Sequence, residues 1–334
     1  MKKRSYVGVL MIIIFILCTS CQNEKDVISK NFPIEKQLKS IKIPTERIFD
    51  IKSVSVVDSS IIFLSEKADT IFHVYSLPEL SFVSSFGIRG EGPNEFFLPS
   101  IVPNNSSHLY VHSNLNMLKK MNIYAAKDTG FMLDEYYLDN VLFGVARNLS
   151  IINDSILYYM EETPHQMKMI SYDLKTGKPI LSRRVRVKED HGSHFDYANN
   201  GFMTVNANTV AYAYLYQNKI DFMNLDFSLR NTLMGQQSEI KIGRNGLDNS
   251  IFYYVDGYVG EENFYFRYLG CSLNDSKSQK KGSIIEVYDK DGNPLIRYHL
   301  DFNIFRFVVD EKNLKIYAVS EDDEDAILMY DIAE

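Results

Sequence analysis

A turn-and-strand pattern recurs six times along this chain of 334 residues, and this repetition limits the fold more than any other feature. Each copy begins with a polar turn, continues into an apolar strand and is followed by a strand that carries an aromatic residue. Successive copies lie 47 to 55 residues apart. They begin at Asp58, Asn105, Asn153, Asn206, Glu261 and Glu311. Six units of this length, each built of short strands, are typical of a six-bladed β-propeller.

The third copy shows the repeating unit most clearly. Residues 156–160, 167–172 and 179–187 have the pattern of three strands joined by tight polar turns. Residues 142–145 supply a fourth strand ahead of them. Asp-Gly and Thr-Gly pairs in several copies provide the positive φ angle that a tight hairpin needs. We therefore expect an all-β protein in which each blade is a four-stranded antiparallel meander.

The two ends of the chain predict how the ring closes. The sixth copy stops at Glu334 after its third strand and leaves no room for an outer strand. Ahead of the first copy, residues 37–43 alternate apolar and polar side chains up to Pro44, a pattern typical of an edge strand. We expect this strand to complete blade six, so that the propeller covers residues 36–334.

The first 20 residues predict a lipoprotein signal peptide. A basic group at residues 2–4 precedes eleven apolar residues at 7–17, which suits a signal sequence and is short for a membrane span. Two small residues then precede Cys21, and this resembles a bacterial lipobox, although Cys18 stands where leucine is usual. We expect Cys21 to carry the lipid. The alternatives are an ordinary secretory signal and an uncleaved anchor.

Residues 21–35 follow as a predicted polar tether between the lipid and the propeller. The acids Glu24 and Asp26 partly resemble the tag that sends some Bacteroidota lipoproteins to the cell surface. The expected location is therefore the cell envelope, lipid-anchored and at the outer membrane, on either its periplasmic or its surface face.

The charge balance excludes several classes of partner. Cleavage after residue 20 would remove three of the 36 basic residues and none of the 43 acidic ones, leaving a net charge of −10. Such a surface disfavours nucleic acid and anionic lipid headgroups. Membrane attachment is therefore expected to depend on acyl chains. Cys271 would be the one remaining thiol, which excludes an intramolecular disulfide and a thiolate zinc site.

Residues 85–99 contain the most distinctive string, a Gly-x-x-Gly-x-Gly-Pro-x-Glu-Phe sequence that starts at Gly87. A phosphate-binding loop would need a helix after the glycines, whereas here aromatic residues lead into another strand. We expect a tight crossing between blades, with Phe96 and Phe97 packed between them. The string resembles the blade junction of NHL-like and TolB-like six-bladed propellers, especially Bacteroidota lipoproteins. This resemblance implies a fold and a location rather than an activity.

The residues that enter the predicted inner strands are the candidate ligand-binding set. In a propeller these strands line a central channel, and loops at one mouth usually form the binding face. Arginine and tyrosine there could hold an anionic or sugar-like ligand, or they could only plug the channel. The set consists of Arg147, Tyr197, Asn199, Tyr253, Tyr254 and Arg306.

Two segments could bind a divalent metal ion. His191, His194 and Asp196 lie together on an insertion, and residues 321–325 are five consecutive acids. The first group lacks a fourth ligand, and the second lacks the glycine that calcium loops use for their turn. Solvated loops are the simpler interpretation of both segments, so no cofactor is expected.

The sequence thus predicts a lipid-anchored propeller that binds a protein, peptide or glycan partner in the envelope. No catalytic residue is assigned, since neither a Gly-x-Ser-x-Gly nor a His-Glu-x-x-His motif occurs. The alternative is a metal-dependent hydrolase or lyase, because propeller lactonases resemble this architecture. That alternative requires acidic side chains and asparagines that converge in the channel.

Overall fold

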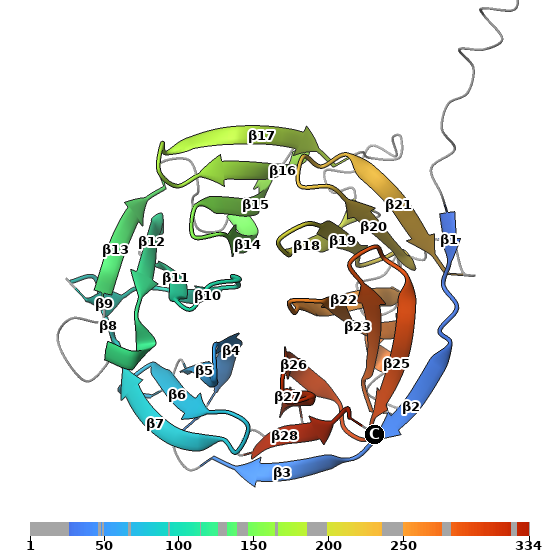
Figure 1. Ribbon diagram of the computed structural model, residues 1–334, viewed down its shortest axis with the longest axis horizontal. Helices are drawn as coiled ribbons and strands as arrows, with labels where there is room; N and C mark the ends of the chain where they lie inside the picture. Colours follow the sequence, from blue (N-terminus) through green and yellow to red (C-terminus); the bar gives the residue numbers. More distant parts are fainter. Residues whose placement is uncertain are drawn as a thin grey trace, which may run out of the picture.

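The computed structural model describes residues 27–45, 48, 50–65, 68–92, 94–113, 115–125, 132–138, 146–163, 166–185, 199–235, 250–275, 282–321 and 326–333. Figure 1 shows six sheets arranged as blades around a central axis. Each blade contains four antiparallel strands, from an inner strand at the axis to an outer strand at the rim. The prediction of an all-β six-bladed propeller is confirmed.

The first three blades follow the chain in order. Blade one consists of β4 (Ile51–Val57), β5 (Ser60–Ser65), β6 (Phe72–Ser76) and β7 (Ser81–Phe86). Blade two consists of β10 (Ser100–Val102), β11 (Leu109–Ser113), β12 (Met117–Met121) and β13 (Met132–Tyr137). Blade three consists of β14 (Ala146–Ile152), β15 (Ile156–Thr163), β16 (Gln166–Asp173) and β17 (Lys178–Arg184).

The other three blades complete the ring. Blade four consists of β18 (Gly201–Val205), β19 (Val210–Tyr214), β20 (Lys219–Met223) and β21 (Leu229–Met234). Blade five consists of β22 (Phe252–Val259), β23 (Asn263–Cys271), β24 (Ile284–Asp289) and β25 (Pro294–Leu300). Blade six consists of β26 (Ile304–Asp310), β27 (Lys315–Ser320), β28 (Ala326–Asp331) and β3 (Ser40–Pro44). Within the described residues, no helix is long and apolar enough to cross a membrane.

The ring closes where β3 joins β28. The two strands are antiparallel, with Ile41 opposite Met329 and Ile43 opposite Ile327. The outer strand of blade six therefore comes from the start of the chain, as the sequence predicted. Because two distant parts of the chain share this blade, the closure ties the ring together without a disulfide.

The segment before β3 adds a fifth strand to each of two blades. β1 (Val27–Ser29) pairs in parallel with β21 of blade four, and β2 (Ile34–Leu38) pairs in parallel with β25 of blade five. We call residues 27–38 the N-terminal strap. The strap corrects the expected boundaries. The sequence placed the end of a tether at residue 35 and the start of the propeller at residue 36, whereas the strap pairs with the blades on both sides of that boundary.

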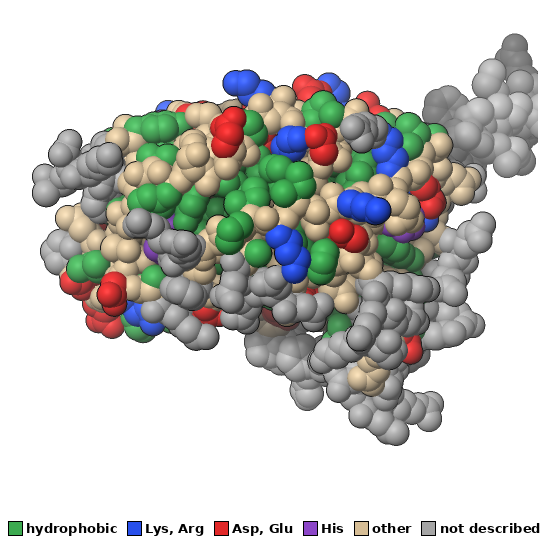
Figure 2. Space-filling view, turned by 90° about the horizontal axis from the view of Figure 1, so that it is seen from below, with side chains coloured by type: hydrophobic (Ala, Val, Ile, Leu, Met, Phe, Trp, Pro, Cys, Tyr) green, Lys and Arg blue, Asp and Glu red, His purple; other side chains and the backbone are tan. Residues whose placement is uncertain are grey.

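Apolar side chains fill the spaces between neighbouring blades. Six buried clusters each combine residues of two adjacent blades, so every blade contributes both of its faces to the core. Tyrosines are prominent among the largest buried side chains. Figure 2 shows the rim, where acidic, basic and hydrophobic side chains are interspersed. The fold thus rests on contacts between blades and not on one central core.

The Gly-rich string forms the predicted crossing from blade one to blade two. Gly87 has a φ angle of +78°, and a Cβ atom there would lie 2.8 Å from the ring of Phe72. Phe96 is fully buried and packs edge-on against Phe72, with 5.1 Å between the ring centroids. β8 (Ile88–Arg89) and β9 (Glu95–Phe96) form a short parallel pair within this crossing. The backbone therefore approaches a buried aromatic ring where only glycine leaves room.

Candidate functional site

The inner strands of all six blades enclose a central cavity of about 700 Å³. Its lining is mixed, since serine, threonine and asparagine side chains alternate with apolar ones. The serine, threonine and asparagine residues of the lining are Ser53, Ser55, Ser100, Asn148, Ser150 and Thr204. Charged side chains come from four inner strands, at Lys52, Arg147, Asp256 and Arg306. This cavity is the candidate binding site.

Arg147 and Arg306 are the two predicted binding residues that the structure brings to the cavity. Each is partly exposed, at 40% and 38% of its side-chain surface, and each is paired with an acid. Arg147 Nη2 lies 2.7 Å from Glu162 Oε2, and Arg306 Nη1 lies 3.4 Å from Asp256 Oδ1. The acids hold both guanidinium groups in place and leave part of each accessible to a ligand.

Asp256 is the residue of this site that the sequence did not identify. Burial raises the pKa of its carboxyl group above the usual value, while Arg306 and Arg267 act in the opposite direction. Asp256 is the only carboxylate among the described residues that line the cavity. Within the described part of the chain, no group of three His, Cys, Asp or Glu side chains is placed to hold a metal ion.

Of the other predicted binding residues, the three that the structure describes do not line the cavity. Tyr253 and Tyr254 are buried between blades four and five. Asn199 is buried as well, and its carbonyl oxygen accepts a 2.6 Å hydrogen bond from the hydroxyl group of Tyr212. Tyr197 lies outside the described residues, as does Cys21. The possible metal ligands at 191–196 and most of the acidic run, 322–325, also lie outside them.

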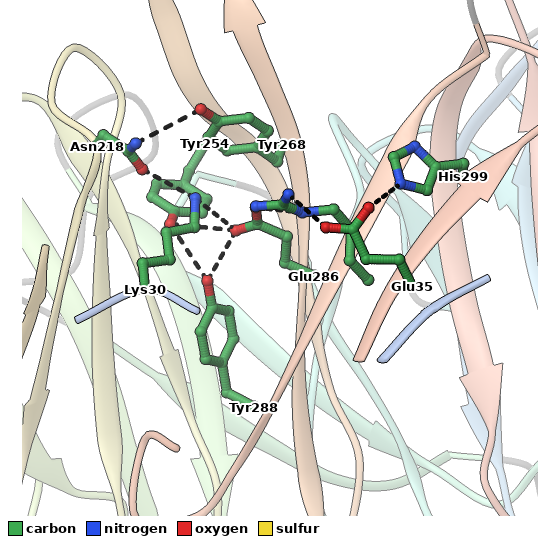
Figure 3. A network of polar contacts seen from close by, with 9 residues as sticks. Lys30, Glu35, Asn218, Tyr254, Tyr268, Glu286, Tyr288 and His299 are labelled. Atoms are coloured by element: carbon green, nitrogen blue, oxygen red, sulfur yellow. Dashed lines mark hydrogen bonds and ion pairs between the residues drawn. The ribbon is translucent and has the colours of Figure 1, made fainter. Parts of the chain in front are cut away.

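A second group of charged residues lies where the N-terminal strap crosses from blade four to blade five (Figure 3). The ammonium group of Lys30 is 2.8 Å from Glu286 Oε2, and these side chains are 3% and 0% exposed. Lys30 also donates a 2.9 Å hydrogen bond to Asn218 Oδ1. Its nitrogen lies over the ring of Tyr268, 3.7 Å from the centroid, and 4.9 Å from that of Tyr254. A strap residue is thus surrounded by groups from two blades.

Glu286, on β24, is the centre of this group. It accepts a 2.7 Å hydrogen bond from the hydroxyl of Tyr288 and a 3.3 Å bond from that of Tyr254. Arg297 Nη2 pairs with its other oxygen at 2.9 Å. Burial is the first cause that raises the pKa of both tyrosines well above the usual value, and the Glu286 charge adds to it. These hydroxyls therefore stay protonated and act as donors to the carboxylate.

The group extends outward to β2. Arg297 Nη1 pairs with Glu35 Oε1 at 3.0 Å, and His299 Nε2 lies 3.0 Å from the other oxygen of Glu35. Arg297 also lies over the ring of Phe32, 4.6 Å from its centroid. The strap is therefore held through three of its side chains, two of them charged and one aromatic.

Because of Lys30, the free energy of unfolding is expected to depend on pH above neutrality. Burial lowers its pKa from 10.5 to about 8, although Glu286 acts in the opposite direction. The unfolded chain then binds one more proton than the folded chain between these values, so stability rises with pH across that window. Relative to Lys30→Met, the natural protein should gain about 2 kcal/mol between pH 7 and pH 9.5. Urea unfolding of both proteins at the two pH values measures this, and a constant difference would contradict it.

These features define the protein as a six-bladed propeller that carries a strap over two blades and a polar central cavity. A family model described as TolB-like 6-blade propeller-like matches residues 31–312. The chain therefore belongs to this TolB-like propeller family, and the predicted resemblance to TolB-like propellers is confirmed. No curated protein sequence matches the chain.

Solved structures show the same fold at low sequence identity. A Bacteroides fragilis protein described as exported matches with a TM-score of 0.58 and 13% identity, covering 91% of this chain and 99% of its own. A Bacteroides vulgatus member of the DUF4221 family matches with a TM-score of 0.57 and 13% identity, covering 92% and 98%. The calcium-binding protein regucalcin from Agrobacterium tumefaciens matches with a TM-score of 0.50 and 11% identity, covering 90% and 96%. At these identities the likeness concerns the fold alone.

Proposed function

We propose that this protein is a binding module of the cell envelope and that its ligand enters the central cavity at Arg147 and Arg306. The observation that carries the proposal is a cavity of about 700 Å³ to which all six blades contribute. That volume lies within the range of small-molecule sites, and a few polar groups on a largely preformed wall are typical of them. A chain end or a side group of a peptide or glycan would fit such a space.

The chemistry of the lining favours a ligand with hydroxyl or anionic groups. Serine, threonine and asparagine can exchange hydrogen bonds with hydroxyl groups, and guanidinium forks bind carboxylates in two-point contacts. Arg147 and Arg306 each form an ion pair with an acid of the protein. A ligand carboxylate can bind the same guanidinium group beside that acid. The metal-dependent hydrolase requires several converging carboxylates, whereas the described lining supplies Asp256 alone.

The anchoring part of the proposal rests on the sequence. The basic start, the eleven apolar residues and Cys21 support export followed by lipidation. Solved relatives of the same fold include a protein described as exported, which agrees with an envelope location. The partner is a protein, peptide or glycan that the propeller meets on the aqueous side of the outer membrane.

The experiment is a binding screen with residues 24–334 against acidic peptides and uronate-containing oligosaccharides, followed by calorimetry on any hit. We expect Arg147→Ala and Arg306→Ala each to weaken binding by roughly 10- to 100-fold, because a hydrogen bond to a charged group contributes about 1.5–3 kcal/mol. Arg230→Ala is the matched control, since Arg230 pairs with Asp291 at the rim, away from the cavity. Equal affinity in all three variants would contradict the proposed site.

A further inference from the structure

The structure fixes the direction in which the chain reaches the propeller. β1 runs parallel to β21, with Val27 opposite Thr232 and Ser29 opposite Met234. β1 therefore runs away from the end of blade four at which the outer strand begins, and Val27 is its residue nearest to that end. Within a four-stranded antiparallel meander the inner and outer strands run in opposite directions. The inner strand of blade four thus begins at the other end of the ring.

The arginine end of the central cavity lies at that other end. Arg147 is the second residue of β14, and Arg306 is the third residue of β26. Both are inner strands, and the six blades repeat one meander around one axis (Figure 1). The two arginines therefore lie near the end of the ring at which inner strands begin, which is opposite to the end nearest to Val27 within β1.

The strap fixes the place on the rim at which the start of the chain joins the ring. Lys30 occupies a buried place between blades four and five, and its departure would remove one of the two cations that neutralise Glu286. Ile28 and Phe32, on either side of Lys30, pack against the apolar cluster between the same blades. The described part of the chain therefore first joins the ring at β1 on blade four, and not at β3 on blade six.

The length of chain ahead of β1 limits how far blade four can lie from a lipid on Cys21. Five residues, 22–26, lie between Cys21 and Val27, so six Cα–Cα steps join the two. Fully extended, they span about 20 Å. A propeller of this size is about 50 Å across. A lipid at Cys21 would therefore bring blade four close to the membrane, while blade one lies across the ring from it (Figure 1).

We propose that the membrane lies beside blade four, at the end of the ring where the outer strands begin, so that the arginine end of the cavity faces away from the lipid. This rests on the lipid anchor of the proposed function. The surface that blade four meets is the headgroup layer of the membrane that holds the acyl chains. The partner then reaches Arg147 and Arg306 from the aqueous side.

The test uses lipidated protein on vesicles whose headgroups carry a nitroxide, which quenches only nearby fluorophores. Single cysteines for the fluorophore are placed in a Cys271→Ser background. The first, Ser228→Cys, lies just before β21 on blade four. The second, Ser81→Cys, lies at the start of β7, the outer strand of blade one. The third, Met234→Cys, lies at the other end of β21. All three positions are exposed. We expect quenching several-fold stronger at position 228 than at 81, with position 234 intermediate.

A longer tether provides the matched control. About 15 Gly and Ser residues inserted after residue 26 add roughly 20 Å of reach without touching a described residue, and they should reduce the difference among the three positions. Equal quenching in the natural protein, or stronger quenching at 234 than at 228, would overturn the proposed orientation. Protein that stays in solution would instead overturn the lipid anchor, and the orientation with it.

Discussion

Replacement of Glu286 by glutamine should lower the free energy of unfolding by about 3–5 kcal/mol, the cost of leaving buried charges without their partner. The side chain keeps its shape in this variant but loses its charge. Lys30 and Arg297 would then face each other without the carboxylate that now neutralises them at 2.8 and 2.9 Å. The Tyr288 hydroxyl would also lose a charged acceptor at 2.7 Å. Urea unfolding followed by circular dichroism at pH 7 measures the loss.

Glu35→Gln is the matched control for this variant. Glu35 also accepts from Arg297, but its side chain is 50% exposed, so water replaces much of what the substitution removes. We expect its loss to stay within about 1 kcal/mol, as for other exposed ion pairs. Equal losses in the two variants would show that burial of the charges contributes little.

The fold could be predicted because each blade is encoded locally. A meander needs only short apolar strands separated by turn residues, and both signals repeat at a nearly constant period along the chain. The closure by β3 could also be predicted, because an unmatched strand at the start complements a missing strand at the end. One local detail differed: in the second copy the strand expected to carry an aromatic residue, β12, has none and ends at Met121, and Tyr124 lies in a short 3-10 helix, η1 (Ile123–Ala125).

The strap could not be predicted from the same signals. A parallel strand that joins a blade from the rim has no hairpin turn before it, and its partners lie far away in the sequence. Asn218, which bonds to Lys30, is 188 residues further along the chain. β1 has only three residues, and three of the five residues of β2 are polar, so the sequence around Lys30 did not indicate a buried segment.

The site could be predicted only in part, because a place on an inner strand does not fix whether a side chain reaches the cavity. Arg147 and Arg306 reach the cavity as the inner-strand rule predicts. On β22 the pairing with β23 shifts register between Phe252 and Tyr254, and again between Tyr254 and Asp256. Each shift moves the following side chains relative to the partner strand. Asp256, which follows both shifts, lines the cavity, whereas the hydroxyl group of Tyr254 donates a hydrogen bond to Glu286.

Removal of residues 1–45 should abolish the cooperative fold, whereas removal of residues 1–38 should only weaken it. The shorter deletion takes away the strap and leaves β3 in place. The longer deletion also removes the outer strand of blade six, which exposes one edge of β28 and leaves Ile327 and Met329 without their cross-strand neighbours. Blade six would then have an open edge and would no longer join the two ends of the chain. The protein would lose backbone hydrogen bonds and apolar contacts at the same place.

Thermal unfolding of chains that start at residues 24, 39 and 46 separates these two contributions. The chain from 39 should unfold in one transition at a lower temperature than the chain from 24, because the buried contacts of Lys30 and Phe32 are lost. The chain from 46 should show no sharp transition, since five paired residues of β3 close the whole ring. Similar transitions for the chains from 39 and 46 would mean that the blades hold one another without this closure. In that case the packing of the six clusters between neighbouring blades would be sufficient to keep the propeller closed.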